Sequence, residues 1–205
     1  MIAVGITGST GMGKTAAAKA FARRGYPVFD ADAEVRRLLS EDGRTIVAVR
    51  KAFPEAWDGQ TIDRLRLAAT VFANTSALGR LEAILHPKVR TAERAFLRAA
   101  KRTGARLAVL EVPLLFETGS ERLCDVVLVV SAPRKVQEAR VLARPGMTRR
   151  RLAAMRARQL SDLEKRRQAD YVVDTSGPKP KMLRELAKII RTLDPPRPRK
   201  PAARS

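Results

Sequence analysis

Residues 8–15 read Gly-Ser-Thr-Gly-Met-Gly-Lys-Thr, which matches the phosphate-binding pattern G-x-x-x-x-G-K-[ST] at every required position. The apolar run 2–6 precedes this stretch, and the alanine-rich run 16–21 follows it. The glycines let the backbone curl so that several N–H groups converge on one anion, and the following helix adds the positive end of its dipole. A strand, a phosphate loop and a helix in this order predict a nucleoside triphosphate site, whereas an isolated glycine-rich turn would lack this context.

The residue types of the loop predict separate roles. The Lys14 side chain is long enough to reach the β- and γ-phosphates, and the hydroxyl of Thr15 can ligate Mg²⁺. We therefore expect a nucleoside triphosphate and Mg²⁺ as the ligands. The residues expected to contact the nucleotide are Gly8, Gly11, Met12, Gly13, Lys14, Thr15 and Ala16.

Composition is typical of a globular protein: 45% of the 205 residues are hydrophobic. Apolar runs are all too short to cross a membrane, and the N-terminus enters a strand directly without a leader pattern. The single cysteine, Cys124, excludes an intrachain disulfide and fits a reducing compartment. We expect a cytoplasmic protein with no membrane partner.

The charge is strongly positive, with 41 Lys and Arg against 21 Asp and Glu, for a net charge of +20. Such a field attracts polyanions, including nucleic acid, in a salt-dependent and nonspecific way. Aromatic residues make up only 4% of the chain, and no base-stacking pattern or zinc motif is present. We therefore expect weak nonspecific binding at most and no dedicated nucleic acid partner. Residues 195–205 are basic and contain four prolines, which predicts a disordered, solvated tail.

Short apolar runs alternate with longer helical patterns along the chain. The expected strands, at 2–7, 27–30, 107–112, 126–131 and 171–174, are rich in Val, Ile and Leu. Strands that barely alternate in polarity are typical of a parallel sheet covered on both faces. Helical patterns are expected at 14–24, 33–39, 64–103, 134–167 and 180–193. The order predicts an α/β fold with a doubly wound, parallel, five-stranded sheet, whose ligands collect beyond the carboxyl ends of the strands.

Two acidic groups follow expected strands at that edge. Asp30-Ala31-Asp32 comes after the second strand; Asp30 suits a helix N-cap, and Asp32 is a candidate base or magnesium residue. Glu111 ends a buried strand, where a lone carboxylate is costly. It can either hold the water ligands of Mg²⁺ or form a buried pair with Lys or Arg.

Basic groups form two further clusters. His86-Pro87 is expected at the end of a helix, where a histidine is commonly a capping cation. Arg140 and Arg144 share one helix face, and Thr148 is expected to N-cap a helix whose first turn holds Arg149, Arg150 and Arg151. These arginines either close on phosphates as part of a lid or form a solvated face.

The motifs, in this order, resemble the dephospho-CoA kinase family. Besides the loop starting at Gly5, the shared features are Asp-Ala-Asp, His-Pro at 86–87, Val-Pro-Leu-Leu-Phe-Glu at 112–117, Gln137 with Arg140, Gln159, and Ala-Asp-Tyr at 169–171. The resemblance covers about residues 1–193. One departure is Glu111, because the family usually has Asp at this position.

The resemblance implies ATP-dependent phosphorylation of the ribose 3′-hydroxyl of dephospho-CoA, which is the last step of coenzyme A synthesis. It implies a catalytic set of Lys14, Asp32 and Arg140, with Arg140 also contacting ATP, and an acceptor site with Asp32, His86 and Leu114. A monomeric kinase domain would span 1–194, with a helical cap at about 42–103 and a lid at about 145–169.

Other P-loop classes remain as alternatives. A different small-molecule kinase, such as a nucleoside monophosphate or shikimate kinase, would lack Pro-Leu-Leu-Phe-Glu together with His-Pro. A GTPase switch would carry Asn-Lys-x-Asp for guanine, which is absent from this sequence. A nucleic-acid-associated ATPase is suggested only by the net charge.

Overall fold

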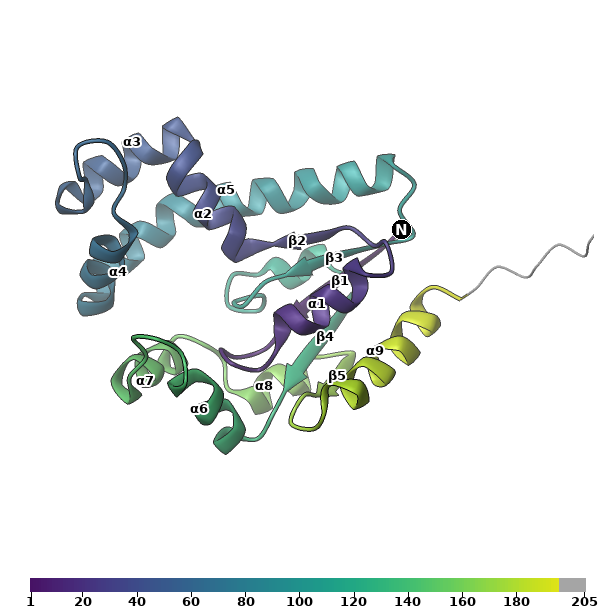
Figure 1. Ribbon diagram of the computed structural model, residues 1–205. Helices are drawn as coiled ribbons and strands as arrows, with labels where there is room; N and C mark the ends of the chain where they lie inside the picture. Colours follow the sequence, from purple (N-terminus) through teal and green to yellow (C-terminus); the bar gives the residue numbers. More distant parts are fainter. Residues whose placement is uncertain (196–205) are drawn as a thin grey trace, which may run out of the picture.

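Five parallel strands form the centre of the computed structural model, which describes residues 1–195 (Figure 1). Their order across the sheet is β2-β3-β1-β4-β5. The strands are β1 (Ile2–Thr7), β2 (Val28–Asp30), β3 (Leu107–Glu111), β4 (Val126–Ser131) and β5 (Tyr171–Asp174). The predicted doubly wound, parallel, five-stranded sheet is confirmed, with strand ends within one residue of expectation. Residues 196–205, most of the predicted disordered tail, lie outside the described residues.

Helices cover both faces of this sheet. The helices are α1 (Lys14–Ala22), α2 (Ala31–Glu41), α3 (Gly43–Ala52), α4 (Arg64–Ala73), α5 (Thr75–Arg102), α6 (Arg134–Leu142), α7 (Arg149–Ala157), α8 (Asp162–Arg167) and α9 (Lys179–Leu193), with 3-10 turns η1 (Pro54–Ala56) and η2 (Ser120–Leu123). Phe21 of α1 and Leu186 of α9 pack in one core with the strands, and Phe96 and Leu97 of α5 pack in another. No helix within residues 1–195 is both long and apolar enough to cross a bilayer.

The register of the strands decides where polar groups gather. Glu111 at the end of β3 is paired in register with Ile6 of β1 and with Asp30 of β2. All strands are parallel, so the phosphate loop after β1 starts beside the carboxyl ends of both neighbours.

Helices α2, α3, α4 and the first half of α5 pack together and project from one end of the sheet (Figure 1); we call this group the cap, and it starts before the expected range 42–103 and does not include the end of that range. The cap has a hydrophobic core of its own, with Leu38 on α2, Val49 on α3 and Leu81 on α5 among its buried members. Asp42 caps α3, and its Oδ1 atom also forms an ion pair with Nζ of Lys88 on α5 at 3.3 Å. The second half of α5 continues onto the sheet, so this helix connects the cap to the fold's main body.

The expectation that a helix ends at His86 is wrong. Helix α5 runs through both His86 and Pro87. Proline removes one helical hydrogen bond, and this loss is tolerated where the freed carbonyl can reach water. Pro87 and Ala83, four residues earlier, are both exposed, which satisfies that condition.

Two of the long helical patterns are interrupted. The pattern at 64–103 divides at Asn74, whose side chain accepts hydrogen bonds from the N–H groups of Ser76 and Ala77 and so starts α5. The pattern at 134–167 contains α6, α7 and α8. Thr148 caps α7 as expected, and Ser161 starts α8 with a reciprocal capping box to Glu164.

Candidate active site

The phosphate loop is held against β4 and opens toward a cavity. Gly8 has φ 149°, and a Cβ there would lie 2.4 Å from the carbonyl oxygen of Val130, so only glycine fits this position. Gly13 precedes α1 in the left-handed conformation and offers no side-chain cap. The N–H groups of Lys14 and Thr15, the first two residues of α1, have no intrahelical partner and are available to an anion, whereas the N–H of Ala16 donates to the carbonyl oxygen of Gly13 at 3.1 Å.

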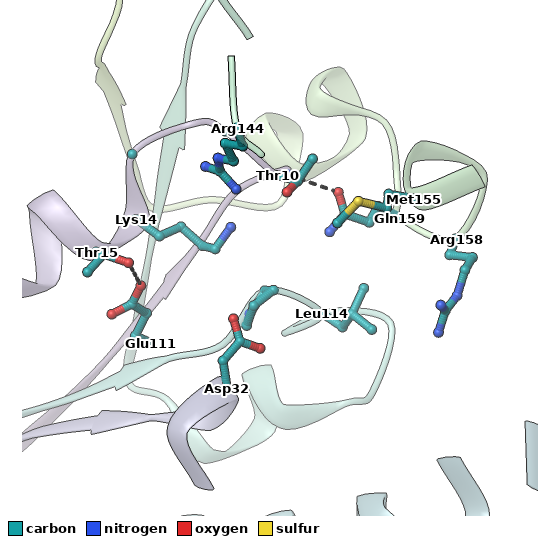
Figure 2. A pocket seen from close by; sticks show the side chains of 13 residues that line it. Thr10, Lys14, Thr15, Asp32, Glu111, Leu114, Arg144, Met155, Arg158 and Gln159 are labelled. Carbon is teal, nitrogen blue, oxygen red and sulfur yellow. Dashed lines mark hydrogen bonds between the residues drawn. The ribbon is translucent and has the colours of Figure 1, made fainter. Parts of the chain in front are cut away.

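A cavity of about 380 Å³ lies against this loop, between Lys14 on one side and Asp32 and Leu114 on the other (Figure 2). Its wall is made by the phosphate loop, by the ends of β2 and β3, and by the segment that carries α7. The lining residues are Thr10, Gly11, Gly13, Lys14, Thr15, Asp32, Glu111, Pro113, Leu114, Arg144, Met155, Arg158 and Gln159. The expected members Gly11, Gly13, Lys14, Thr15, Asp32, Glu111 and Leu114 are therefore brought together, whereas Gly8, Met12 and Ala16 are not part of this lining.

Lys14 supplies the positive charge nearest the loop. Its Nζ donates hydrogen bonds to the carbonyl oxygens of Gly8 at 2.7 Å and Ser9 at 3.3 Å. Burial lowers the pKa of Lys14 to about 8, and the Asp32 carboxylate opposes this shift. A bound phosphate would act in the same direction as Asp32, because an adjacent anion favours the charged ammonium.

Asp32 faces the same space from the first turn of α2. Asp30 is the N-cap of that helix and accepts from the N–H of Ala33 at 2.9 Å, so Asp32 is free of a capping role. Desolvation raises the pKa of the Asp32 carboxyl, the charge of Asp30 adds to the rise, and Lys14 opposes it. A carboxyl whose pKa is shifted in this way and that faces a cavity is a candidate general base.

Thr15 and Glu111 place two hydrogen-bonded oxygen groups beside the loop. The Thr15 hydroxyl donates to Glu111 Oε1 at 2.7 Å, and burial raises the pKa of the Glu111 carboxyl. Within residues 1–195, Glu111 has no ion pair with lysine or arginine, so that alternative is wrong for the described chain. Hard oxygen donors suit Mg²⁺, which keeps several waters and phosphate ligands when it binds beside a nucleotide. Residues 1–195 contain no group of three or more His, Cys, Asp and Glu side chains that could hold a metal ion without other ligands.

A second cavity, of about 140 Å³, adjoins the first on the side of the cap. Asp32, Pro113 and Leu114 line both cavities. His86 lines the second one together with the buried acid Glu93, while Val35, Val89 and Val112 provide apolar surface. The histidine singled out from the sequence therefore does share a site with Asp32 and Leu114, from the middle of a helix.

The arginines of α6 and the following turn divide into two groups. Arg140 donates to the carbonyl oxygen of Thr175 at 2.6 Å and to its hydroxyl at 3.2 Å, and it does not line the cavity. Arg144, one helical turn later, points into the cavity toward Lys14 (Figure 2). Arg149, Arg150 and Arg151 are exposed and line neither cavity, as the solvated alternative predicts.

Thr10 in the phosphate loop is held by two glutamines. Its N–H donates to Gln159 Oε1 at 3.2 Å, and its carbonyl oxygen accepts from Gln137 Nε2 at 2.8 Å. Gln137 in turn accepts from Arg156 of α7 at 3.0 Å. Both glutamines belong to the family pattern, but spacing alone does not reveal that they contact one residue.

The dephospho-CoA kinase family model matches residues 2–180 of the chain. A dephospho-CoA kinase from Brucella melitensis is 48% identical over 190 residues, which cover 93% of this chain and 94% of the relative. One from Paramagnetospirillum magneticum is 54% identical over 163 residues, covering 80% of this chain and 77% of the relative. Among solved structures, TT1252 from Thermus thermophilus superposes with a TM-score of 0.77 at 37% identity, covering 94% of this chain and 97% of the other. A shikimate kinase from Acinetobacter baumannii (TM-score 0.52, 17% identity, 94% and 93% coverage) is similar in fold alone.

Proposed function

This chain belongs to the dephospho-CoA kinase family, which catalyses the final ATP-dependent step of coenzyme A synthesis, and from this premise we propose which of its residues carry the reaction. The reaction transfers the γ-phosphoryl group of ATP to the ribose 3′-hydroxyl of dephospho-CoA, releasing coenzyme A and ADP. One observation carries the assignment of sites: Asp32, Pro113 and Leu114 line both the cavity above the phosphate loop and the one beside His86. We assign the first cavity to the triphosphate and the second to the acceptor.

Asp32 is the proposed general base. Its position on the wall shared by the two cavities supports this role, because an acceptor hydroxyl in one cavity and a γ-phosphate in the other would meet at this wall. The ionised carboxylate accepts the hydroxyl proton as the oxygen attacks phosphorus and the bond to the leaving ADP oxygen breaks. His86 and Leu114 are proposed to hold the acceptor on the other side of this wall.

Lys14, Arg140 and Arg144 are the proposed source of positive charge for the transferring group. Phosphoryl transfer spreads negative charge over the equatorial oxygens, and cations already in position lower the barrier. Lys14 and Arg144 line the cavity, and Arg140 is held by Thr175, whose hydroxyl also donates to Met12 in the phosphate loop at 2.9 Å. Arg140 reaches ATP only if it exchanges its bonds to Thr175 for bonds to phosphate.

Thr15 and Glu111 are the proposed residues for Mg²⁺, with Thr15 as a direct ligand and Glu111 accepting from Thr15 or from the metal's waters. The 2.7 Å hydrogen bond between them and their hard oxygen atoms support the fit. Mg²⁺ bound to the phosphates neutralises charge that develops during transfer.

Replacing Glu111 with glutamine should raise the Mg²⁺ concentration for half-maximal rate by about tenfold, because residues that orient metal ligands are worth about 10- to 100-fold in metal affinity. The measurement is the initial rate at saturating ATP over a Mg²⁺ series. Glu111→Asp, which keeps the charge and introduces the usual family residue, is the matched control and should stay nearer the native requirement. An unchanged Mg²⁺ dependence in Glu111→Gln would remove Glu111 from the metal site.

The activity itself is tested with purified protein, ATP, Mg²⁺ and dephospho-CoA. The product mass should increase by one phosphate at the ribose 3′ position, with ADP formed in equal amount. No phosphorylated product from a folded protein that binds ATP would contradict the acceptor assignment.

We further propose that the enzyme acts as a cytoplasmic monomer without a dedicated nucleic acid or membrane partner. The single cysteine supports a reducing compartment, and the net charge of +20 is expected to give only salt-sensitive, nonspecific nucleic acid binding. Light scattering gives the mass in solution, and RNA binding should disappear at raised ionic strength.

A further inference from the structure

Helix α8 carries a lysine that no solvent reaches. Lys165 has 0% relative exposure, although the neighbouring Arg166 and Arg167 are exposed. Its Nζ lies 2.8 Å from Glu117 Oε1 and donates to the carbonyl oxygen of Pro113 at 3.1 Å. A buried ammonium is costly unless it is paired and hydrogen-bonded, so both contacts are needed to keep it there.

Glu117 is itself fixed from another direction. The same Oε1 atom accepts a hydrogen bond from the backbone N–H of Leu160 at 2.7 Å. Leu160 follows Gln159, which holds Thr10 of the phosphate loop. These contacts fix the Glu117 carboxylate relative to the nucleotide cavity. The ion pair with this carboxylate in turn fixes the ammonium group of Lys165.

The other end of this chain of contacts is the wall between the two cavities. Pro113 and Leu114 line both of them, and the Pro113 carbonyl oxygen accepts from Lys165 and, at 3.2 Å, from the Thr7 hydroxyl at the end of β1. Hydrogen bonds thus link the segment that follows β3 to β1 on one side and to α8 on the other.

We propose that Lys165 and Glu117 are positioning residues for the acceptor: they hold Pro113 and Leu114 where dephospho-CoA must lie to meet the γ-phosphate. This inference rests on the proposed function, because it presumes that the wall formed by Pro113 and Leu114 contacts the acceptor. Neither residue touches the reacting atoms. A purely structural pair would change the folded fraction and the melting temperature and leave the KM for dephospho-CoA unaltered.

The test compares Lys165→Met with the double variant Glu117→Met and Lys165→Met. The single variant leaves a buried carboxylate without its cation, whereas the double variant replaces the pair with apolar groups, which buried sites commonly tolerate. Both should raise the KM for dephospho-CoA by about tenfold or more, since displacement of a substrate contact by about 1 Å can cost up to about 100-fold. The KM for ATP should change far less. Should the single variant not fold, the double variant decides.

Two controls make the result specific. Arg167→Met removes an exposed charge from the same helix and should behave like the native enzyme. Glu117→Gln keeps an oxygen for Lys165 and Leu160, so it should recover most of the acceptor affinity. An acceptor KM within twofold of native in the folded double variant, or an equal rise in both KM values, would overturn the inference. A native enzyme that does not phosphorylate dephospho-CoA would instead refute the proposed function.

Discussion

Replacing Lys14 with alanine should lower kcat by at least about 10³-fold, because its ammonium lines the cavity that we assign to the triphosphate and is our proposed source of charge for the transferring phosphoryl group. One preorganised donor at a developing charge is worth about 10²–10³ in kcat, and under our proposal Lys14 also binds the phosphates of ATP before transfer. Its Nζ lies within hydrogen-bonding distance of Gly8 and Ser9, inside the phosphate loop. The measurement is steady-state product formation, with ATP affinity measured separately by calorimetry.

Lys19→Ala is the matched control for this variant. Lys19 lies on the same helix, α1, and is exposed, so its removal should leave kcat and both KM values close to native. Turnover by Lys14→Ala at a native rate would refute the assignment of the phosphate loop as the site of transfer.

Replacing Asp32 with asparagine should lower kcat by about 10²–10⁴-fold, because asparagine cannot accept the proton of the acceptor hydroxyl. ATP binding should survive, since Asp32 makes no hydrogen bond to the phosphate loop in the described chain. If Asp32→Asn binds ATP but does not transfer phosphate, then Asp32 acts as a base and not as a metal ligand or a structural residue. Loss of ATP binding with normal kcat at saturating ATP would contradict the proposed role.

Asp30→Asn provides the control, since asparagine caps helices about as well as aspartate. Asp30 caps α2, so this variant should keep the fold and a rate of the same order as native.

The pH dependence offers a second measurement on Asp32. Desolvation raises the pKa of the Asp32 carboxyl. The carboxyl is therefore fully ionised only at pH values above this raised pKa, and the ionised base is lost as the pH falls through it. The native kcat/KM for dephospho-CoA should therefore decline at a higher pH than an ordinary aspartate would produce. The residual activity of Asp32→Asn should not show this decline at acidic pH. Asp30→Asn should still show the decline, but at a lower pH, because the negative charge of Asp30 contributes to the raised pKa of Asp32.

Predictions from sequence succeeded where the relevant contacts are local. The phosphate loop lies between a strand and a helix as expected, and Asp30 and Thr148 cap the helices that follow them. The five strands are predictable from the sequence because a parallel strand that is covered on both faces consists largely of consecutive apolar residues. Their arrangement then brings Asp32 and Glu111 beside the loop, since parallel strands end at a common edge.

Predictions from sequence fail at two places, for different reasons. Pro87 predicts a helix end, yet the exposure of Pro87 and Ala83 lets α5 continue, and the helix carries His86 to the cavity beside Asp32. Arg140 and Arg144 share a helix face, and spacing does not distinguish the one held by Thr175 from the one that lines the cavity.

The amino-acid sequence was therefore sufficient to predict the fold class, the phosphate loop between β1 and α1, and the presence of Lys14, Asp32 and Glu111 beside one cavity. Only the tertiary structure shows that Pro113 and Leu114 form a wall between two cavities and that Lys165 is buried against Glu117. The physical reason is that periodicity and short motifs report backbone conformation and hydrogen bonds between near neighbours. A lysine in a run of charged residues is buried only when the packing of α8 against the segment after β3 supplies a carboxylate and a carbonyl oxygen to pair with it.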